Sequence, residues 1–366
     1  MTDGAGQGPD VLAELGYGPQ GSAPEAPSWT WSTVDFNAPT DGQDFDEYAG
    51  RLRIAAPAGG SFNYTLRFSA DEGQSWCYGR ATGGVLGVAT VSPVSIADAR
   101  IQAPSVIRSV AGIAPAPVYI QIEVPGYTLA QGPPTGDGAV VARVLYGPAG
   151  GMPPTSFSAA LATYNVLGPQ GSYDEFVAQL PALAAGDYDL AAGFALPAGA
   201  EVFGDLDGSA TGGYAFAQAK RLIVRAPAGG SVGYCATQFP SSQGVVMGPG
   251  GGQSAVVYGR VFKSGVTQGA GWGAGVAGQL GAGAVGTAPE TWTQWTTAEY
   301  TRDVDGLSSG DQGNDEYESV LVFPAGQLGT RDYGYRFTAD GVTWTYCGLA
   351  PAGSSAAFVP GTVTLR

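Results

Sequence analysis

The sequence contains no histidine, only three cysteines and few charged residues. Without histidine, the Ser-His-Asp and Cys-His mechanisms, histidine general bases and histidine zinc sites are excluded. No P-loop or Cys-x-x-Cys motif occurs, and the G-x-G-x-x-G matches at 273–278 and 281–286 do not open a helix after a strand. Paired carboxylates for glycoside hydrolysis stay open, because a sequence does not give their separation. We expect a protein that is not an enzyme.

Basic residues and long apolar runs are also scarce. Lys and Arg number 16 against 31 Asp and Glu, which gives a net charge of −15. A field of that sign repels nucleic acid and anionic lipid, so we expect no nucleic-acid partner. No run of about 18 apolar residues is present, which predicts no membrane span. The start, MTDGAGQGPD, shows neither the basic nor the apolar region of a signal peptide.

Glycine, proline and aromatic residues are abundant. The chain of 366 residues has 60 glycines and 26 prolines, and 11% of it is aromatic. Glycine and proline favour tight turns, whereas aromatic and β-branched residues favour strands. In DYGYRF, Tyr333, Tyr335 and Phe337 alternate with Gly334 and Arg336, which predicts a strand with one aromatic face. The sequence therefore predicts an all-β fold.

An acidic pair beside aromatic residues occurs three times, as FDEY at 45–48, YDEF at 173–176 and NDEY at 314–317. The spacing between the copies is that of a domain, which indicates tandem modules. The first and third copies match further at Tyr64 and Tyr333, Arg67 and Arg336, Phe68 and Phe337, Asp71 and Asp340, and Trp76 and Trp344.

About seven short strands per copy indicate tandem immunoglobulin-like β-sandwiches. We expect repeat 1 at 1–98, a divergent repeat 2 at 112–225 and repeat 3 at 229–366. Repeat 1 opens partway through the unit, so it is predicted to be incomplete at its N-terminus and to lack its first strands. Two explanations stay open. The sequence is a fragment or has a misassigned start, or a neighbouring chain supplies the missing strand and the protein self-associates as a strand-sharing fibre or surface-array subunit.

The acids of the repeated motif are expected at loop-to-strand junctions, in water. A second interpretation is a calcium site, because residues 302–316 hold Asp303, Asp305, Asp311, Asp315 and Glu316. Calcium takes six to eight oxygen ligands on a flexible loop. The spacing differs from an EF-hand and the other copies lack the set, so calcium stays an alternative to having no cofactor.

The cysteines predict one disulfide. Cys235 lies in the first strand of repeat 3 and Cys347 near its last strands, and such strands face one another in a sandwich. We expect a Cys235–Cys347 bond with Cys77 left over, which implies an oxidising compartment outside the cytoplasm. The alternative is three buried free thiols.

Tryptophans give the best lead to a ligand. Trp29 and Trp31 in repeat 1 correspond to Trp292 and Trp295 in repeat 3, and Trp272 is extra. Exposed indole rings near carboxylates suit the apolar faces of sugars, which predicts carbohydrate binding. The competing interpretation places one tryptophan of each pair in the sandwich core.

The segments YGRVFKSGVTQGAGWGAGVAGQLG, GNDEYESVLVFPAG and DYGYRFTADGVTWTYCG resemble a tandem repeat of secreted and cell-surface proteins of myxobacteria and their relatives. The resemblance is close over repeat 3, good from Gly4 to Gly79 and looser over repeat 2. It implies an accessory role outside the cell or at its surface, because that family has no assigned activity and accompanies other modules. A weaker resemblance, over one hairpin per repeat, is to starch-type carbohydrate-binding modules.

Three functions therefore remain. The first is an extracellular structural or adhesive spacer, the second is a carbohydrate-binding array with a glycan or cell-surface partner, and the third is an enzyme of no identified kind.

Overall fold

The computed structural model describes residues 7–366 apart from 9, 38–45, 53, 55–58, 81–84, 92–94, 103, 126–127, 129–139, 169–170, 197–199, 208–212, 305–312 and 350–357. These residues are all-β, and their helices are two single 3₁₀ turns, Phe216–Gln218 and Pro289–Thr291. None of the described helices has the length and apolar character needed to cross a membrane. Repeat 1, up to Ser95, is one compact unit, and repeats 2 and 3, from Ile96 onward, form the other.

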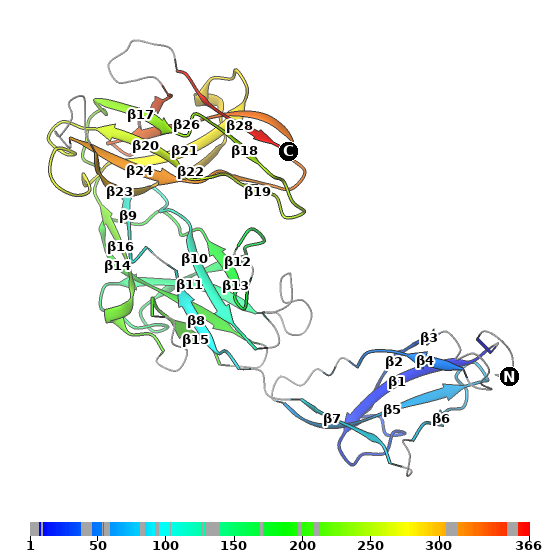
Figure 1. The fold of residues 1–366 in the computed structure, drawn as a ribbon. Coiled ribbons are helices and arrows are strands. Elements are labelled where there is room, and N and C mark those ends of the chain that lie inside the picture. The colour runs from blue at the N-terminus through cyan, green and yellow to red at the C-terminus, as the bar shows by residue number, and fades with distance from the viewer. Residues whose placement is uncertain are drawn as a thin grey trace. The chain divides into compact units, whose positions relative to one another are not determined.

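Repeat 3 is an immunoglobulin-like sandwich of two sheets (Figure 1). One sheet has the order β17-β20-β24-β23, and the other has the order β18-β28-β26-β21-β22 with β27 beside β26. Strands β19 and β25 form a separate pair. The bounds are β17 Tyr234–Phe239, β18 Ser242–Val245, β19 Gly252–Gln253, β20 Val257–Phe262, β21 Ala277–Ala284, β22 Gln294–Thr297, β23 Glu299–Val304, β24 Asn314–Ser319, β25 Val322–Phe323, β26 Gly329–Thr338, β27 Thr345–Cys347 and β28 Gly361–Leu365.

Period-two alternation builds the core of repeat 3. Tyr333, Tyr335 and Phe337 share the inner face of β26 and are fully buried, which confirms the predicted aromatic face. Val257 and Val261 of β20 are equally buried in the opposite sheet. The Tyr335 hydroxyl donates a hydrogen bond to the Val257 carbonyl over 2.7 Å, and this bond ties the two sheets together.

Repeat 2 has the same arrangement, except that β12 pairs with strands of both sheets and joins them. The resulting order is β8-β10-β13-β12-β11-β14-β16-β9, with β15 beside β14. The bounds are β8 Asp98–Ile101, β9 Val106–Val110, β10 Val118–Glu123, β11 Val141–Pro148, β12 Ser158–Tyr164, β13 Asp174–Ala178, β14 Gly186–Ala195, β15 Val202–Gly204 and β16 Lys220–Arg225. Strand β8 pairs with β10, and β9 pairs with β16. Both β8 and β9 precede residue 112, so repeat 2 begins earlier than the sequence predicted.

Repeat 1 has one sheet of order β2-β1-β5-β6 with β7 beside β5, and a separate β3–β4 pair. The bounds are β1 Leu12–Pro19, β2 Thr30–Thr33, β3 Asp35–Asn37, β4 Glu47–Ala49, β5 Gly60–Ser69, β6 Cys77–Tyr78 and β7 Gly87–Val91. Its described residues contain no counterparts of β17, β18 and β20. The described part of repeat 1 is therefore a sandwich without its first strands.

The acidic motif opens an equivalent strand in each repeat, namely β4, β13 and β24. Tyr317 of β24 packs edge-on against Tyr300 of β23, with ring centroids 6.1 Å apart and planes at 81°. The same edge-on pair recurs as Tyr164–Phe176 in repeat 2 and Phe36–Tyr48 in repeat 1. This recurrence shows that the three segments are copies of one unit.

The prediction that these acids lie in water is wrong for repeats 2 and 3. Glu175 is 6% exposed and Glu316 is 1% exposed, whereas Glu47 is exposed. Arg302 donates to Glu316 over 2.8 Å, and Gln102 donates to Glu175 over 2.7 Å. Such charge-assisted hydrogen bonds offset the cost of burying a carboxylate, and the sequence did not reveal their donors.

Candidate functional site

A guanidinium lies between two indole rings in repeat 3. The guanidinium carbon of Arg336 is 4.1 Å from the ring centroid of Trp295 and 4.3 Å from that of Trp344. Its Nε donates to the side-chain oxygen of Gln279 over 2.9 Å. Cation–π attraction on two faces and a hydrogen bond in the guanidinium plane fix this side chain.

Repeat 1 contains the same stack. Arg67 lies 4.2 Å from the centroid of Trp31 and 4.0 Å from that of Trp76, and its Nε donates to Glu14 over 2.7 Å. Repeat 2 has Gly193 at this register position and no stack there. The sequence comparison matched Arg67 with Arg336 and Trp76 with Trp344, but it did not show that arginine and tryptophan are in contact.

The paired tryptophans of the predicted sugar site pack against one another. Trp29 and Trp31 stack with centroids 5.4 Å apart, and Trp292 and Trp295 stack at 5.7 Å. Trp29 is 7% exposed and Trp292 is 6% exposed, so one tryptophan of each pair is buried. Their rings lie over Gly18 and Gly283 on the outer face of the sheet, so the interpretation that one of each pair lies in the sandwich core is wrong. Trp31 and Trp295 are half-buried, and part of each ring contacts the stacked arginine.

Trp272 is a packing residue rather than part of either stack. Its indole nitrogen donates to the Tyr317 hydroxyl over 3.0 Å, and its ring packs against the core of repeat 3. Within repeat 3, Trp272 therefore does not join the stack of Trp292 and Trp295. Trp31 and Trp295 are the stacked tryptophans whose rings also reach solvent.

The candidate calcium ligands separate onto two faces of a sheet. Asp303 and Asp315 lie opposite each other on β23 and β24, whereas Glu316 is held by Arg302. Asp305 and Asp311 lie outside the described residues. The described residues hold no group of three or more metal-ligating side chains.

Asp303 and Asp315 instead bind the backbone of the loop before β21. Asp315 accepts from the Gly273 amide and Asp303 from the Gly271 amide, over 2.7 and 2.8 Å. Burial raises the pKa of Asp315 to about 7, and the charge of Asp303 adds to this effect. The Oδ1 atom of Asp315 has no hydrogen-bond partner among the described residues. The pair thus anchors a loop.

Cys235 and Cys347 form the predicted disulfide, with Cα atoms 5.5 Å apart across the sandwich of repeat 3. The bond closes a separation of 112 residues. Cys77 is free and exposed. It pairs with Phe68, whose counterpart Phe337 pairs with Thr345, so Cys77 lies two residues before the position of Cys347.

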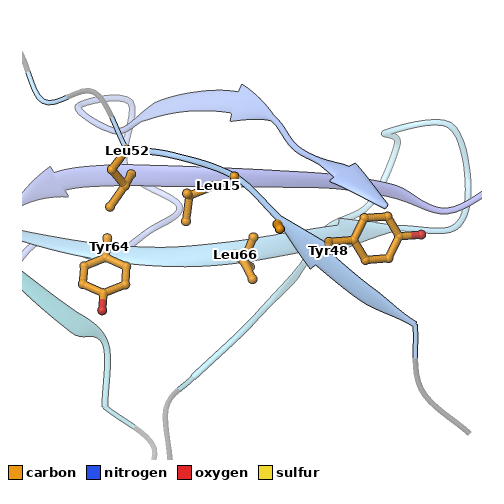
Figure 2. A pocket seen from close by; sticks show the side chains of 7 residues that line it. Leu15, Tyr48, Leu52, Tyr64 and Leu66 are labelled. Atoms are coloured by element: carbon orange, nitrogen blue, oxygen red, sulfur yellow. The ribbon is translucent and has the colours of Figure 1, made fainter. Parts of the chain in front are cut away.

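Repeat 1 carries an open groove on the inner face of its sheet. A pocket of about 420 Å³ lies there, lined chiefly by Leu15, Tyr48, Leu52, Tyr64 and Leu66. Figure 2 shows that these side chains come from the β4 segment and from β1 and β5. The walls of this groove are therefore leucine and tyrosine side chains.

Repeats 2 and 3 meet at an apolar junction. Val110, Ile113 and Ala277 are buried there, with Trp272 and Trp344 packed against them. Two of these residues come from repeat 2 and three from repeat 3. This contact was not predictable from the sequence, because no repeated motif contains Val110 or Ile113.

Polar contacts surround this junction. Thr297 donates to the Ala114 carbonyl over 2.9 Å, and the Arg108 amide donates to Glu299 over 3.4 Å. Burial raises the pKa of Glu299 to about 7 and lowers the pKa of Lys220, whose charge acts on Glu299, to about 8. The two sandwiches are thus joined by packed, hydrogen-bonded surfaces.

No family model and no curated protein matches the chain. Solved structures similar to it include the fibronectin(III)-like modules of CbhA from Clostridium thermocellum, with a TM-score of 0.20 and 13% identity over 73% of this chain and 92% of that one. The FN1–FN3 domains of chicken CNTN1 have a TM-score of 0.24 and 10% identity, over 98% of this chain and 95% of that one. Cadherin-like domains 1 to 4 of zebrafish RET have a TM-score of 0.18 and 8% identity, over 98% of this chain and 66% of that one. At these TM-scores the likeness carries no functional argument, and the fold rests on the strand pairing described above.

Proposed function

We propose that the protein is a non-catalytic extracellular array of β-sandwich modules that acts as a structural or adhesive spacer. The junction of repeats 2 and 3 carries this proposal, because it joins two complete sandwiches through buried apolar side chains. A spacer needs modules that do not move freely, and a packed junction limits such movement. The Cys235–Cys347 disulfide supports a location outside the cytoplasm.

The junction is tested by placing a charge within it in the full chain. Ile113→Asp buries an unpaired carboxylate and is expected to separate the two sandwiches. Hydrogen exchange should then speed up at 106–114 and 294–304 while β26 keeps its protection, and small-angle scattering should show a larger maximum dimension. Val246→Asp is the matched control, since Val246 is 87% exposed. Equal behaviour of the two variants would remove the basis of the spacer proposal.

Carbohydrate binding is a second candidate, supported by the partly exposed rings of Trp31 and Trp295. Tryptophan fluorescence titrated with starch, xylan, chitin and cellulose oligosaccharides tests it. A saturable change that disappears in Trp31→Ala or Trp295→Ala supports a sugar site. An unchanged spectrum with every glycan leaves the spacer as the function.

A further inference from the structure

The residues that line the groove of repeat 1 are core residues in repeat 3. Tyr64 is 37% exposed, whereas Tyr333, at the same register position, is fully buried. Leu66 is half-buried where Tyr335 is 0% exposed. Leu15 and Leu52 are also half-buried, whereas their counterparts Leu280 and Leu321 are buried in the core of repeat 3. Among the described residues, the groove is therefore core surface without a covering strand.

The other repeats show what the cover is. In repeat 3, β20 lies over this surface with Val257 and Val261 fully buried, and the Val257 carbonyl accepts from Tyr335. In repeat 2, β10 does the same with Val118, Ile120 and Ile122, all 0% exposed. Each covering strand has a burial pattern of period two, and its buried positions are aliphatic apart from Gly259 of β20.

The edge of β4 is open in the same way. Strand β24 pairs with β20 on one edge and β23 on the other, and β13 pairs with β10 and β12. Within the described residues, β4 pairs with β3 alone. Its backbone thus offers unpaired hydrogen-bonding groups beside an apolar groove, which is the arrangement that strand addition uses.

Charge adds a further condition on the occupant. In repeat 3, Arg260 lies opposite Glu316, and in repeat 2, Gln121 lies opposite Glu175 and donates to it over 3.4 Å. Glu47 is the counterpart of these glutamates and is exposed. A strand seated on β4 would therefore place a basic or amide side chain opposite Glu47.

We propose that the groove of repeat 1 binds an extended segment of another polypeptide, which adds antiparallel to β4 with aliphatic side chains at alternate positions and a basic or amide residue opposite Glu47. The segment would complete the sandwich as β20 completes repeat 3. This inference does not depend on the spacer role, since the groove lies wholly within repeat 1.

A labelled peptide with the sequence of residues 255–264, AVVYGRVFKS, tests this with the chain of 366 residues. Fluorescence anisotropy should show saturable binding, and hydrogen exchange should slow at 47–52 and 60–69. A permuted peptide of the same composition is the control, because it keeps the charge and loses the alternation. No saturable binding, equal binding of the permuted peptide, or protection elsewhere would overturn the proposal. So would a concentration-dependent dimer that the peptide does not dissociate, because a second copy would then be the occupant.

Two variants place the binding in the groove. Leu52→Glu should weaken the peptide affinity about tenfold or more, while Leu161→Glu, at a residue that is 75% exposed, should leave it unchanged. If Leu52→Glu unfolds repeat 1, Glu47→Lys replaces it, because Glu47 is exposed. This charge reversal should weaken binding of the arginine-bearing peptide, and unchanged affinity would contradict the assigned register.

Discussion

Asp332 accepts a hydrogen bond from the backbone amide of Gly286 over 2.7 Å and closes the turn after β21. Gly286 has φ of +75°, which glycine adopts without strain. The bond recurs from Gly150 to Asp189 over 2.7 Å and from Gly21 to Asn63 over 2.6 Å. The acceptor lies on the ten-residue strand of each repeat, so this contact belongs to the copied unit.

Removing that acceptor should destabilise repeat 3. Asp332→Ala leaves the Gly286 amide without its partner and should lower the free energy of unfolding by about 1–3 kcal/mol, measured by urea denaturation. Asp332→Asn keeps an oxygen acceptor, as Asn63 does in repeat 1, and should cost less than half as much. Equal losses in the two variants would show that the bond is not the cause.

The disulfide should contribute much of the stability of repeat 3. Closing a separation of 112 residues constrains the unfolded chain by about 4–5 kcal/mol. Reduction should lower the urea midpoint of repeat 3 by a corresponding amount, and Cys77→Ser should leave this result unchanged. Alkylation of the native protein should modify Cys77 alone, and labelling of Cys235 or Cys347 without reductant would contradict the pairing.

Stability should fall as the pH rises from acid conditions towards neutrality. Asp315 has a pKa raised from 3.8 to about 7, so the folded protein prefers the protonated form, and ionisation at higher pH removes stability. The loss should develop between about pH 4 and about pH 7 and reach a few kcal/mol. Asp174 and Glu299 shift in the same direction, so the test is the difference between wild type and Asp315→Asn in thermal denaturation at several pH values. A difference that does not change with pH would contradict the assignment.

The arginine stacks should depend on the planar guanidinium rather than on charge. Arg336→Lys keeps the charge but loses the double stacking between Trp295 and Trp344, and should cost about 1–2 kcal/mol of stability. The matched change Arg67→Lys should act on repeat 1 in the same way. Tryptophan emission should shift in both variants, and a variant with unaltered emission and stability would argue against the stack.

The sequence predicted the features that the copies share. Matches such as Tyr64 with Tyr333 revealed the repeat, and the alternation around Tyr335 revealed a strand and its inner face. The disulfide followed because the sandwich brings Cys235 and Cys347 onto facing strands.

Features that depend on contacts between distant segments were not predictable. The burial of Glu316 depends on Arg302, and the anchoring of Asp315 depends on the Gly273 amide. Both donors lie outside the acidic motif, although the bond from Gly273 recurs in repeat 1, where Gly8 donates to Asp46 over 2.7 Å. The early strands β8 and β9 were also unexpected, because they align with nothing in the incomplete repeat 1.

Native-state hydrogen exchange tests the central claim, that one sandwich unit is present three times and that its first copy is open. The amides of Glu47–Ala49 in β4 should exchange far faster than those of β13 and β24, because the described β4 has a strand partner on one edge only. Equal slow exchange in all three strands would show that repeat 1 is closed, and would contradict the account.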